Sequence, residues 1–301
     1  MKRKSILSRQ AQESLIQKMF LGVGMVSLGI LALIMIFLFM EGLPIFKTVS
    51  VKDFLFGKFW YPTSDPPDFG ILSMIVGSGV VTLLSSLMAV PLGVMTAIYL
   101  AEIAGPKTRE IVKPVVELLA ALPSVVIGFF GMVIFAPFLQ ETFDAPTGLN
   151  LFNAALMLAF MAVPTITSLS EDAIFRVPQD LKEASLALGA THWETLYRVT
   201  IPSSLSGVST AVILGMSRAM GETMVVLMVA GGAAMIPTSI FSPVRPMPST
   251  IAAEMAEAAF RGIHYHSLFA IGMVLFVFTL LFNIAADFIA HRYKQTGTAT
   301  L

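Results

Sequence analysis

The sequence predicts an all-α polytopic membrane protein with six transmembrane helices. The chain has 301 residues, of which 56% are hydrophobic and only 13% are charged. Soluble domains carry about a quarter charged residues, so this chain has too little polar surface to coat a water-soluble globule. Its long apolar runs are continuous and lack the period-2 alternation of barrel strands, which favours helices. The formal net charge of zero gives no overall field that would attract nucleic acid.

Six stretches are long enough to cross a hydrocarbon core of about 30 Å, which takes roughly 20 apolar residues. We place the six spans at residues 19–40, 71–100, 115–139, 150–170, 203–236 and 265–289. The first run is too long for the core of a signal peptide and lacks a small-residue cleavage site before Glu41. We therefore expect a retained first membrane helix at 19–40.

Lysine and arginine residues between the spans predict the orientation. One side of the membrane would carry Lys2, Arg3, Lys4, Arg9, Lys18, Lys107, Arg109, Lys113, Arg176, Lys182, Arg198, Arg292 and Lys294. The other side would carry Lys47, Lys52, Lys58, Arg245 and Arg261. Because positive loops stay in the cytoplasm, both the amino terminus (1–18) and the tail (291–301) should be cytoplasmic. The core domain (71–290) then contains a cytoplasmic loop at 176–202, and the aromatic-rich loop 41–70 is external.

Small residues recur at every fourth position in two of the spans. They are Ser85, Ala89, Gly93 and Ala97 in the second span, and Ser203, Gly207, Ala211, Gly215 and Ala219 in the fifth. This spacing places them on one helix face and lets helix backbones approach closely, which is how helices associate in lipid. We expect these two faces to be buried in a helix bundle or at a subunit interface.

Several kinds of chemistry are excluded by what the sequence lacks. There is no cysteine, which excludes disulfides, thiolate metal sites and cysteine nucleophiles. His264 and His266 are two residues apart, a spacing that suits neither a helical zinc pair nor a zinc finger. No G-x-x-x-x-G-K-[ST] sequence occurs, so ATP binding through a P-loop is not expected. We expect no metal site, no catalytic residue and no cofactor on this chain, and energy must come from a partner or an ion gradient.

The loop RVPQDLKEASLALGATHWETLYRVTIP predicts two short helices. Pro178 can start the first helix, and Gly189 permits a sharp turn before the second. The loop is amphipathic, so it could lie on the lipid surface or dock into a groove of a partner. Acidic Asp180, Glu183 and Glu194 are interleaved with the bases, which favours docking over a lysine-rich lipid contact.

The same loop resembles the EAA loop of ABC importer permeases. Glu183, Ala184 and Ser185 are followed by three residues, Gly189, nine residues and then VTIP, where the family pattern has E-A-A, G and I-x-L-P at this spacing. Ser185, Val199 and Ile201 are small departures in residue type. The resemblance implies that Glu183, Ala184 and Gly189 belong to coupling helices that sit in a groove of an ATPase subunit.

Further stretches are similar to the PstC-type permeases of bacterial phosphate importers. These are EGLPIF, FGILSMIVGS, AVPLGVMTAIYLAE, VELLAALPSVVIGFFG, SRAMGETMVVLMVAGG and STIAAEMAEA. The resemblance implies a type I ABC importer permease fold in the bacterial cytoplasmic membrane. It also implies four kinds of neighbour: a homologous second permease, two ATP-binding cassette subunits that hold ATP and Mg²⁺, an external phosphate-binding protein, and membrane lipid.

The sequence SRAMGETM places two charges in the fifth span. A central arginine costs about 2.5–3.5 kcal/mol on insertion scales, so Arg218 needs an explanation. Glu222 follows four residues later, which on a helix places both side chains on one face. Buried ion pairs seldom add net stability, although an internal link between helices remains an alternative. The guanidinium fork suits an oxyanion, and the resemblance implies a translocation gate at Arg218 and Glu222, with hydroxyl contacts from Ser217 and Thr223.

Three alternatives to phosphate import remain open from the residues alone. The cargo could be another oxyanion, such as sulfate or molybdate, or a small solute, because one arginine cannot separate these on charge. An ion-driven secondary carrier is a different class, but it has no need of an EAA-type loop. A purely structural membrane subunit would tolerate loss of the Arg218 charge.

Overall fold

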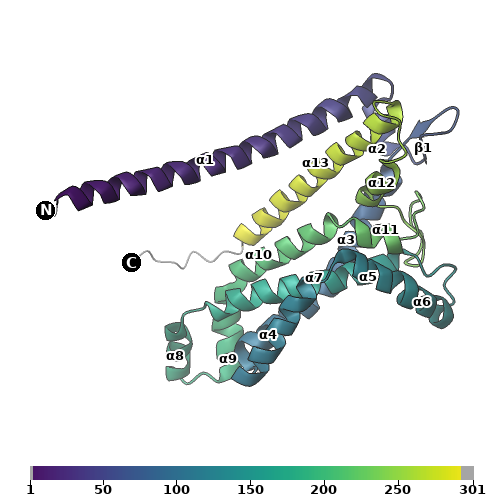
Figure 1. Cartoon of the computed structure of the whole chain (residues 1–301). Coiled ribbons are helices and arrows are strands. Elements are labelled where there is room, and N and C mark those ends of the chain that lie inside the picture. The colour runs from purple at the N-terminus through teal and green to yellow at the C-terminus, as the bar shows by residue number, and fades with distance from the viewer. Residues whose placement is uncertain (1–2, 293–301) are drawn as a thin grey trace.

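Helices dominate the computed structural model, which describes residues 3–292 (Figure 1). The first half contains α1 (Arg3–Gly42), η1 (Leu43–Lys47), α2 (Val51–Phe56), α3 (Leu72–Ile98), η2 (Tyr99–Ile103), α4 (Pro106–Ala120), α5 (Ser124–Phe130), η3 (Gly131–Phe135) and α6 (Ala136–Phe143). The second half contains α7 (Leu151–Phe175), α8 (Gln179–Ala187), α9 (His192–Thr195), η4 (Leu196–Thr200), α10 (Ile201–Met220), α11 (Met224–Val229), α12 (Met247–Glu254) and α13 (Ile263–Arg292). The prediction of an all-α chain is confirmed.

Six helical segments are long and apolar enough to cross a membrane, as the sequence predicts. They are Glu13–Lys47, Leu72–Ile103, Ser124–Phe143, Leu151–Phe175, His192–Met220 and Ile263–Phe288. The predicted tail at 291–301 lies almost wholly outside the described residues.

Helix α7 forms the centre of the bundle, with α3 and α10 packed against it. Glycines allow this close approach. A Cβ atom on Gly93 of α3 would lie 2.8 Å from Ile166 Cγ2 of α7, and one on Gly215 of α10 would lie 2.4 Å from Ile166 Cγ1. A Cβ on Gly207 would lie 2.6 Å from the Cβ of Ala173. The predicted packing role of the small residues is therefore confirmed at these positions.

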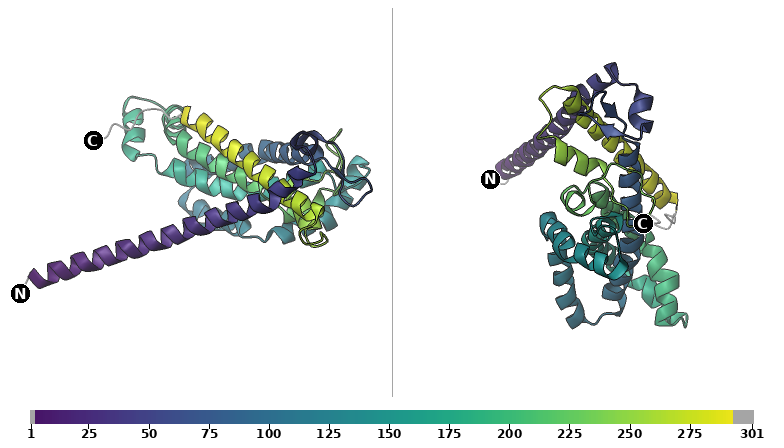
Figure 2. Two further views of the ribbon diagram at one scale, coloured as in Figure 1. Left: turned by 90° about the horizontal axis from the view of Figure 1, so that it is seen from above. Right: turned by 90° about the vertical axis from the view of Figure 1, so that its right-hand side faces the viewer.

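Helices α1 and α13 meet at one end and diverge toward the other, as all views show (Figures 1 and 2). No residue in the most apolar window of α1 is buried within this chain. Exposed leucine, isoleucine and phenylalanine side chains, among them Leu33 and Phe37, follow its length. This surface requires lipid or another protein chain to cover it.

The end of the molecule where α1 and α13 meet also holds a small hairpin, and we call it the hairpin end. Strands β1 (Trp60–Tyr61) and β2 (Asp68–Phe69) pair antiparallel, with Trp60 opposite Phe69. Both aromatic rings are buried with Phe54 in a cluster that includes residues of α12 and α13. The loop 41–70 is thus an ordered part of the fold, with Phe56, Phe59 and Tyr61 left exposed.

The third span differs from its predicted position at 115–139. Helix α4 already begins at Pro106, within the predicted loop, and ends at Ala120. The chain then leaves the helix at 121–123, and the membrane-length segment runs from Ser124 to Phe143. Pro123 explains the break, because proline lacks an N–H donor and disfavours helical geometry in the residue before it.

The fifth span also differs from its predicted position at 203–236. It begins at His192, continues through η4, and ends at Met220. Residues 221–223 are not helical, and the short α11 ends before Gly231 and Gly232, which both adopt positive φ angles. Glycines permit these turns within a run that is apolar throughout. As a consequence, Arg218 lies in the last turn of α10 and not near the middle of a long helix.

Candidate translocation and coupling sites

Arg218 has an exposed side chain at the end of α10. Its Nη1 atom donates to the Thr165 hydroxyl of α7 at 3.3 Å. Among the side chains that the structure describes (residues 13–288), no carboxylate forms an ion pair with Arg218 and none besides Thr165 bonds to it. Most of the guanidinium donors are therefore free to bind an oxyanion.

The prediction that Glu222 shares a helix face with Arg218 is wrong. The helix ends at Met220, and the Glu222 N–H instead donates to the Ala219 carbonyl at 3.3 Å in a tight turn. Gly221 at the helix end, with its low helix propensity, accounts for this. Glu222 and Thr223 are half-buried in the segment that connects α10 to α11, two to three residues beyond the arginine's helix.

Ser217 is directed toward α13. Its hydroxyl lies 2.7 Å from the Ile213 carbonyl and in hydrogen-bond contact with Asn283 Oδ1. The Thr223 hydroxyl lies 3.4 Å from the Gly221 carbonyl, close to the limit for a hydrogen bond. Of the four residues assigned to the gate, Ser217 thus has its polar atom occupied within the protein, whereas Arg218 uses one nitrogen and keeps its other donors available.

The loop after α7 forms two short helices, as predicted. Pro178 precedes α8, Gly189 has a φ of +85° between the helices, and Thr191 and Glu194 form a reciprocal cap at the start of α9. A positive φ disfavours residues with a Cβ, which accounts for glycine at position 189. Glu183, Ala184 and Gly189 are exposed.

The helix pair and the η4 segment after it carry large apolar side chains that are exposed. The side chains of Leu188, Trp193 and Tyr197 are 90%, 69% and 75% exposed. Such a concentration of large exposed side chains next to an acidic helix face is typical of a surface that another protein covers.

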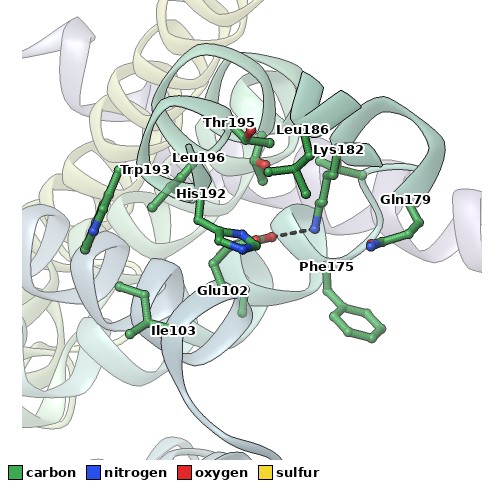
Figure 3. A pocket seen from close by; sticks show the side chains of 13 residues that line it. Glu102, Ile103, Phe175, Gln179, Lys182, Leu186, His192, Trp193, Thr195 and Leu196 are labelled. Atoms are coloured by element: carbon green, nitrogen blue, oxygen red, sulfur yellow. Dashed lines mark hydrogen bonds and ion pairs between the residues drawn. The ribbon is translucent and has the colours of Figure 1, made fainter. Parts of the chain in front are cut away.

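The inner surface of the helix pair is fastened to the membrane helices around a cavity of about 720 Å³ (Figure 3). Lys182 of α8 forms an ion pair with Glu102 of η2 at 2.6 Å, and both side chains are mostly buried. Ser185 and Thr195 exchange a hydrogen bond at 2.9 Å across the turn. Movement of α8 is therefore resisted by the ends of the second and fifth spans.

A larger ionic cluster joins α4 to the end of α7. The Glu171 carboxylate is only 1% exposed, and it accepts from Arg109 and from Lys113 Nζ, the latter at 2.6 Å. Lys113 also contacts Asp172 at 2.8 Å, and the Arg109 guanidinium lies 3.9 Å from the ring centre of Phe175. Burial opposes the charge on Lys113, but its hydrogen bonds to Asp172 and Glu171 outweigh this, so its pKa lies above the usual value.

A third cluster closes the hairpin end. Glu254 of α12 accepts from Arg245 Nη1 at its Oε1 atom (2.6 Å), and its Oε2 atom accepts from Trp60 Nε1 at 3.0 Å and lies 2.8 Å from His264 Nε2. One carboxylate thus links the hairpin, the segment before α12 and the start of α13.

The three clusters were not predicted from the sequence. Glu102, Glu171 and Glu254 are visible as acids at the edges of apolar runs, which is a signal for a paired or functional charge. Their partners lie between 9 and 194 residues away, and no local pattern links them. Thr165 was missed because a hydroxyl in an apolar run has no distinctive spacing.

Comparison with known proteins identifies the family. Residues 89–295 match the family model described as "Binding-protein-dependent transport system inner membrane component". The chain is 39% identical over 263 residues to the "Probable ABC transporter permease protein YqgH" of Bacillus subtilis, covering 87% of this chain and 85% of that protein. It is 37% identical over 264 residues to the "Phosphate transport system permease protein PstC" of Mesorhizobium japonicum, covering 81% and 80%. The PstC protein of Pasteurella multocida is 35% identical, with 81% of each chain covered.

Solved structures agree on the fold. A chain of a bacterial ABC transporter involved in the import of the acidic polysaccharide alginate superposes with a TM-score of 0.66 at 15% identity, covering 97% of this chain and all of that one. A chain of the MetNI methionine ABC transporter, in an inward-facing conformation, gives a TM-score of 0.56 at 21% identity, covering 75% and 95%. Together with the six spans and the helix pair after α7, the family match leads to one conclusion. The chain belongs to the family of binding-protein-dependent transport system inner membrane components, among the PstC-type permeases of ABC importers with the type I fold.

Proposed function

We propose that this chain is one of two permease subunits of an ATP-driven importer of inorganic phosphate in the bacterial inner membrane. Members of its family are transporter subunits that work with ATPase subunits and a substrate-binding protein. Relatives from Mesorhizobium japonicum and Pasteurella multocida carry the name phosphate transport system permease. The observation that carries the cargo proposal is the Arg218 guanidinium, which is exposed and has no acidic partner among the described residues.

Arg218 is the proposed contact for phosphate in transit. The anion carries one to two negative charges near neutral pH, and a guanidinium can donate to two of its oxygens at once. Glu222 and Thr223 follow in the non-helical segment and are proposed to line the same passage, where the carboxylate limits how tightly an anion is held. Ser217 is left out of this proposal because its hydroxyl already contacts Ile213 and Asn283.

The helix pair α8–α9 is the proposed contact for the ATPase subunits. Its exposed Leu188 and Trp193 provide an apolar surface, and Glu183, Ala184 and Gly189 stand on the exposed side of the loop. ATP and Mg²⁺ would be held by those subunits, and both termini of this chain would be cytoplasmic. A phosphate-binding protein would then dock at the opposite, hairpin end, on residues 41–70 and 237–264.

The test is ATP-dependent uptake of labelled phosphate into vesicles that hold this chain with its co-purifying subunits. Arg218→Gln is expected to lower uptake by about tenfold or more, because hydrogen bonds to charged groups contribute about 1.5–3 kcal/mol. Arg218→Lys keeps the charge but loses the fork, so it should retain part of the activity. Lys107→Gln is the matched control, since it removes an exposed charge elsewhere.

Two results would contradict the proposal. Equal uptake in wild type and Arg218→Gln, with assembly intact, would make the arginine a structural residue. Uptake of sulfate without phosphate would keep the transporter class and change the cargo.

A further inference from the structure

The Glu171 cluster holds together two helices that are far apart in the sequence. Arg109 and Lys113 on α4 bind a carboxylate on α7 that is 1% exposed. Helix α4 has no fully buried side chain, so these ion pairs and the Arg109–Phe175 contact are specific links between this helix and α7. A carboxylate this deeply buried needs its cations, because removing one partner leaves an uncompensated charge.

One side of this cluster leads directly to the helix pair at which the ATPase is proposed to dock. Helix α7 ends at Phe175, and α8 begins at Gln179. Between them Val177 is buried, so the connection is short and packed. Displacement of α8 therefore displaces the end of α7 that carries Glu171.

The other side leads toward Arg218. Helix α4 is followed by the break at 121–123 and then by α5, which packs on α11. A Cβ on Gly128 of α5 would lie 3.3 Å from Val225 Cα of α11, so these two backbones are in close contact. Helix α11 begins directly after the non-helical segment 221–223. A shift of α4 would therefore be passed through residues 121–123 to α5, and from α5 to α11 and the residues beside Arg218.

We propose that Glu171 is a positioning residue that couples movement of the helix pair α8–α9 to the translocation passage. The inference rests on the proposed docking of ATPase subunits at α8–α9, but not on the identity of the cargo. In this arrangement α4, the end of α7 and α8 move as one body, and the short connection at 121–123 passes this movement from α4 to α5. Loss of the Glu171 charge breaks the link between α7 and α4. ATP hydrolysis then continues, but it no longer moves the helices that line the translocation passage.

The first experiment measures the ratio of anion transported to ATP hydrolysed in reconstituted complexes. Glu171→Gln should lower this ratio about fivefold or more, within the range of typical coupling free energies, while hydrolysis persists. Lys113→Gln should lower it less, because Arg109 still binds Glu171, and Lys113→Arg should restore it. Glu110→Gln removes an exposed charge from the same helix and should leave the ratio unchanged. If Glu171→Gln fails to assemble, the transport ratios of Lys113→Gln and Lys113→Arg test the proposal in its place.

A second measurement needs no cargo. The chain contains no cysteine, so spin labels can be placed at Glu110 on α4 and Asp180 on α8 by substitution with cysteine. Their separation should stay constant on ATP binding in the wild type and change in Glu171→Gln. An unchanged transport ratio in both Glu171→Gln and Lys113→Gln, or a separation that changes equally in wild type and mutant, overturns the proposal. Transport of sulfate in place of phosphate contradicts the proposed cargo only, since the ratio can be measured with either anion.

Discussion

At the scale of single residues, Arg218 has its polar partner on a neighbouring helix. The Thr165 hydroxyl comes from α7, one residue after Pro164, and accepts from the guanidinium at 3.3 Å. A neutral hydroxyl orients the arginine without neutralising it, unlike a carboxylate, which would compete with an incoming anion. The position of Arg218 therefore depends on how α10 and α7 pack.

Removing the Thr165 hydroxyl should weaken the apparent affinity for the transported anion without abolishing transport. We expect Thr165→Val to raise the apparent KM for phosphate about two- to tenfold, which corresponds to the net value of one hydrogen bond, about 0.5–1.5 kcal/mol. Thr165→Ser keeps the hydroxyl and should behave as wild type. The readout is the concentration dependence of uptake in vesicles. Equal KM values for the Thr165→Val and Thr165→Ser variants would show that the hydroxyl does not position the arginine.

Gly215 should tolerate no side chain, because its α-carbon faces buried Ile166 of α7. A Cβ there would lie 2.4 Å from Ile166 Cγ1, so Gly215→Ala should destabilise the permease by about 1–3 kcal/mol through overpacking. Gly22→Ala in α1 is the matched control, since nothing lies within 4 Å of its added Cβ. Thermal unfolding of the purified permease in detergent compares them. A midpoint for Gly215→Ala no lower than that of Gly22→Ala would contradict the packing.

At the scale of helices, the two breaks in the apolar runs decide where the functional side chains lie. The break at 121–123 separates α4 from the third span, and the break at 221–223 ends the helix of Arg218. Each break places a short non-helical backbone segment next to a membrane-spanning helix. Non-helical backbone at membrane depth is tolerated only where protein or a polar passage surrounds it.

The sequence predicts some of these helices well and others poorly. Local signals mark the helix pair after α7, because Pro178, Gly189 and the Thr191 cap act on their immediate neighbours. The third and fifth spans were misplaced because hydropathy counts apolar residues and does not register a helix end within an apolar run. Likewise Glu171 is visible as a charge at a span end, but its pairing with Arg109 arises only from tertiary packing.

The turn between α8 and α9 should require glycine. Gly189 has a φ of +85°, and with nothing within 4 Å of an added Cβ the cost of Gly189→Ala is conformational, about 1–2 kcal/mol. We expect roughly five- to thirtyfold weaker co-assembly with ATPase subunits, measured by titration of the purified subunits. Gly105→Ala is the control, because Gly105 has an ordinary φ of −64° and equally open surroundings. Equal binding by the two variants would show that the loop adapts to its partner.

At the scale of the whole molecule, the divergence of α1 from α13 leaves an apolar surface that lipid or another chain must cover. Residues of α1 such as Leu31 and Leu33 are mostly exposed within the chain. The family match explains this surface, because an importer permease functions in the membrane within a larger assembly. The divergent shape could not be foreseen from hydropathy, which predicts that a helix is apolar but not what it faces.

The proposed orientation can be tested in intact cells, since the native chain lacks cysteine. Ser64→Cys, in the turn of the hairpin, should react with a membrane-impermeant maleimide added outside. Ala187→Cys, in α8, should react only after the membrane is opened. Labelling in the reverse pattern would invert the topology and with it the assignment of the ATPase and binding-protein surfaces.

The carboxylate of Glu254 also sets an order of events during biosynthesis. Its donor Trp60 lies 194 residues earlier in the chain, whereas His264 lies ten residues later. Because chains emerge from the ribosome amino terminus first, the hairpin must wait for α12 before its indole N–H finds an acceptor. The carboxylate in turn completes its contacts only when α13 begins to emerge. The contacts of this carboxylate are therefore complete only after residue 264 has been synthesised, and a chain interrupted earlier would lack one of them.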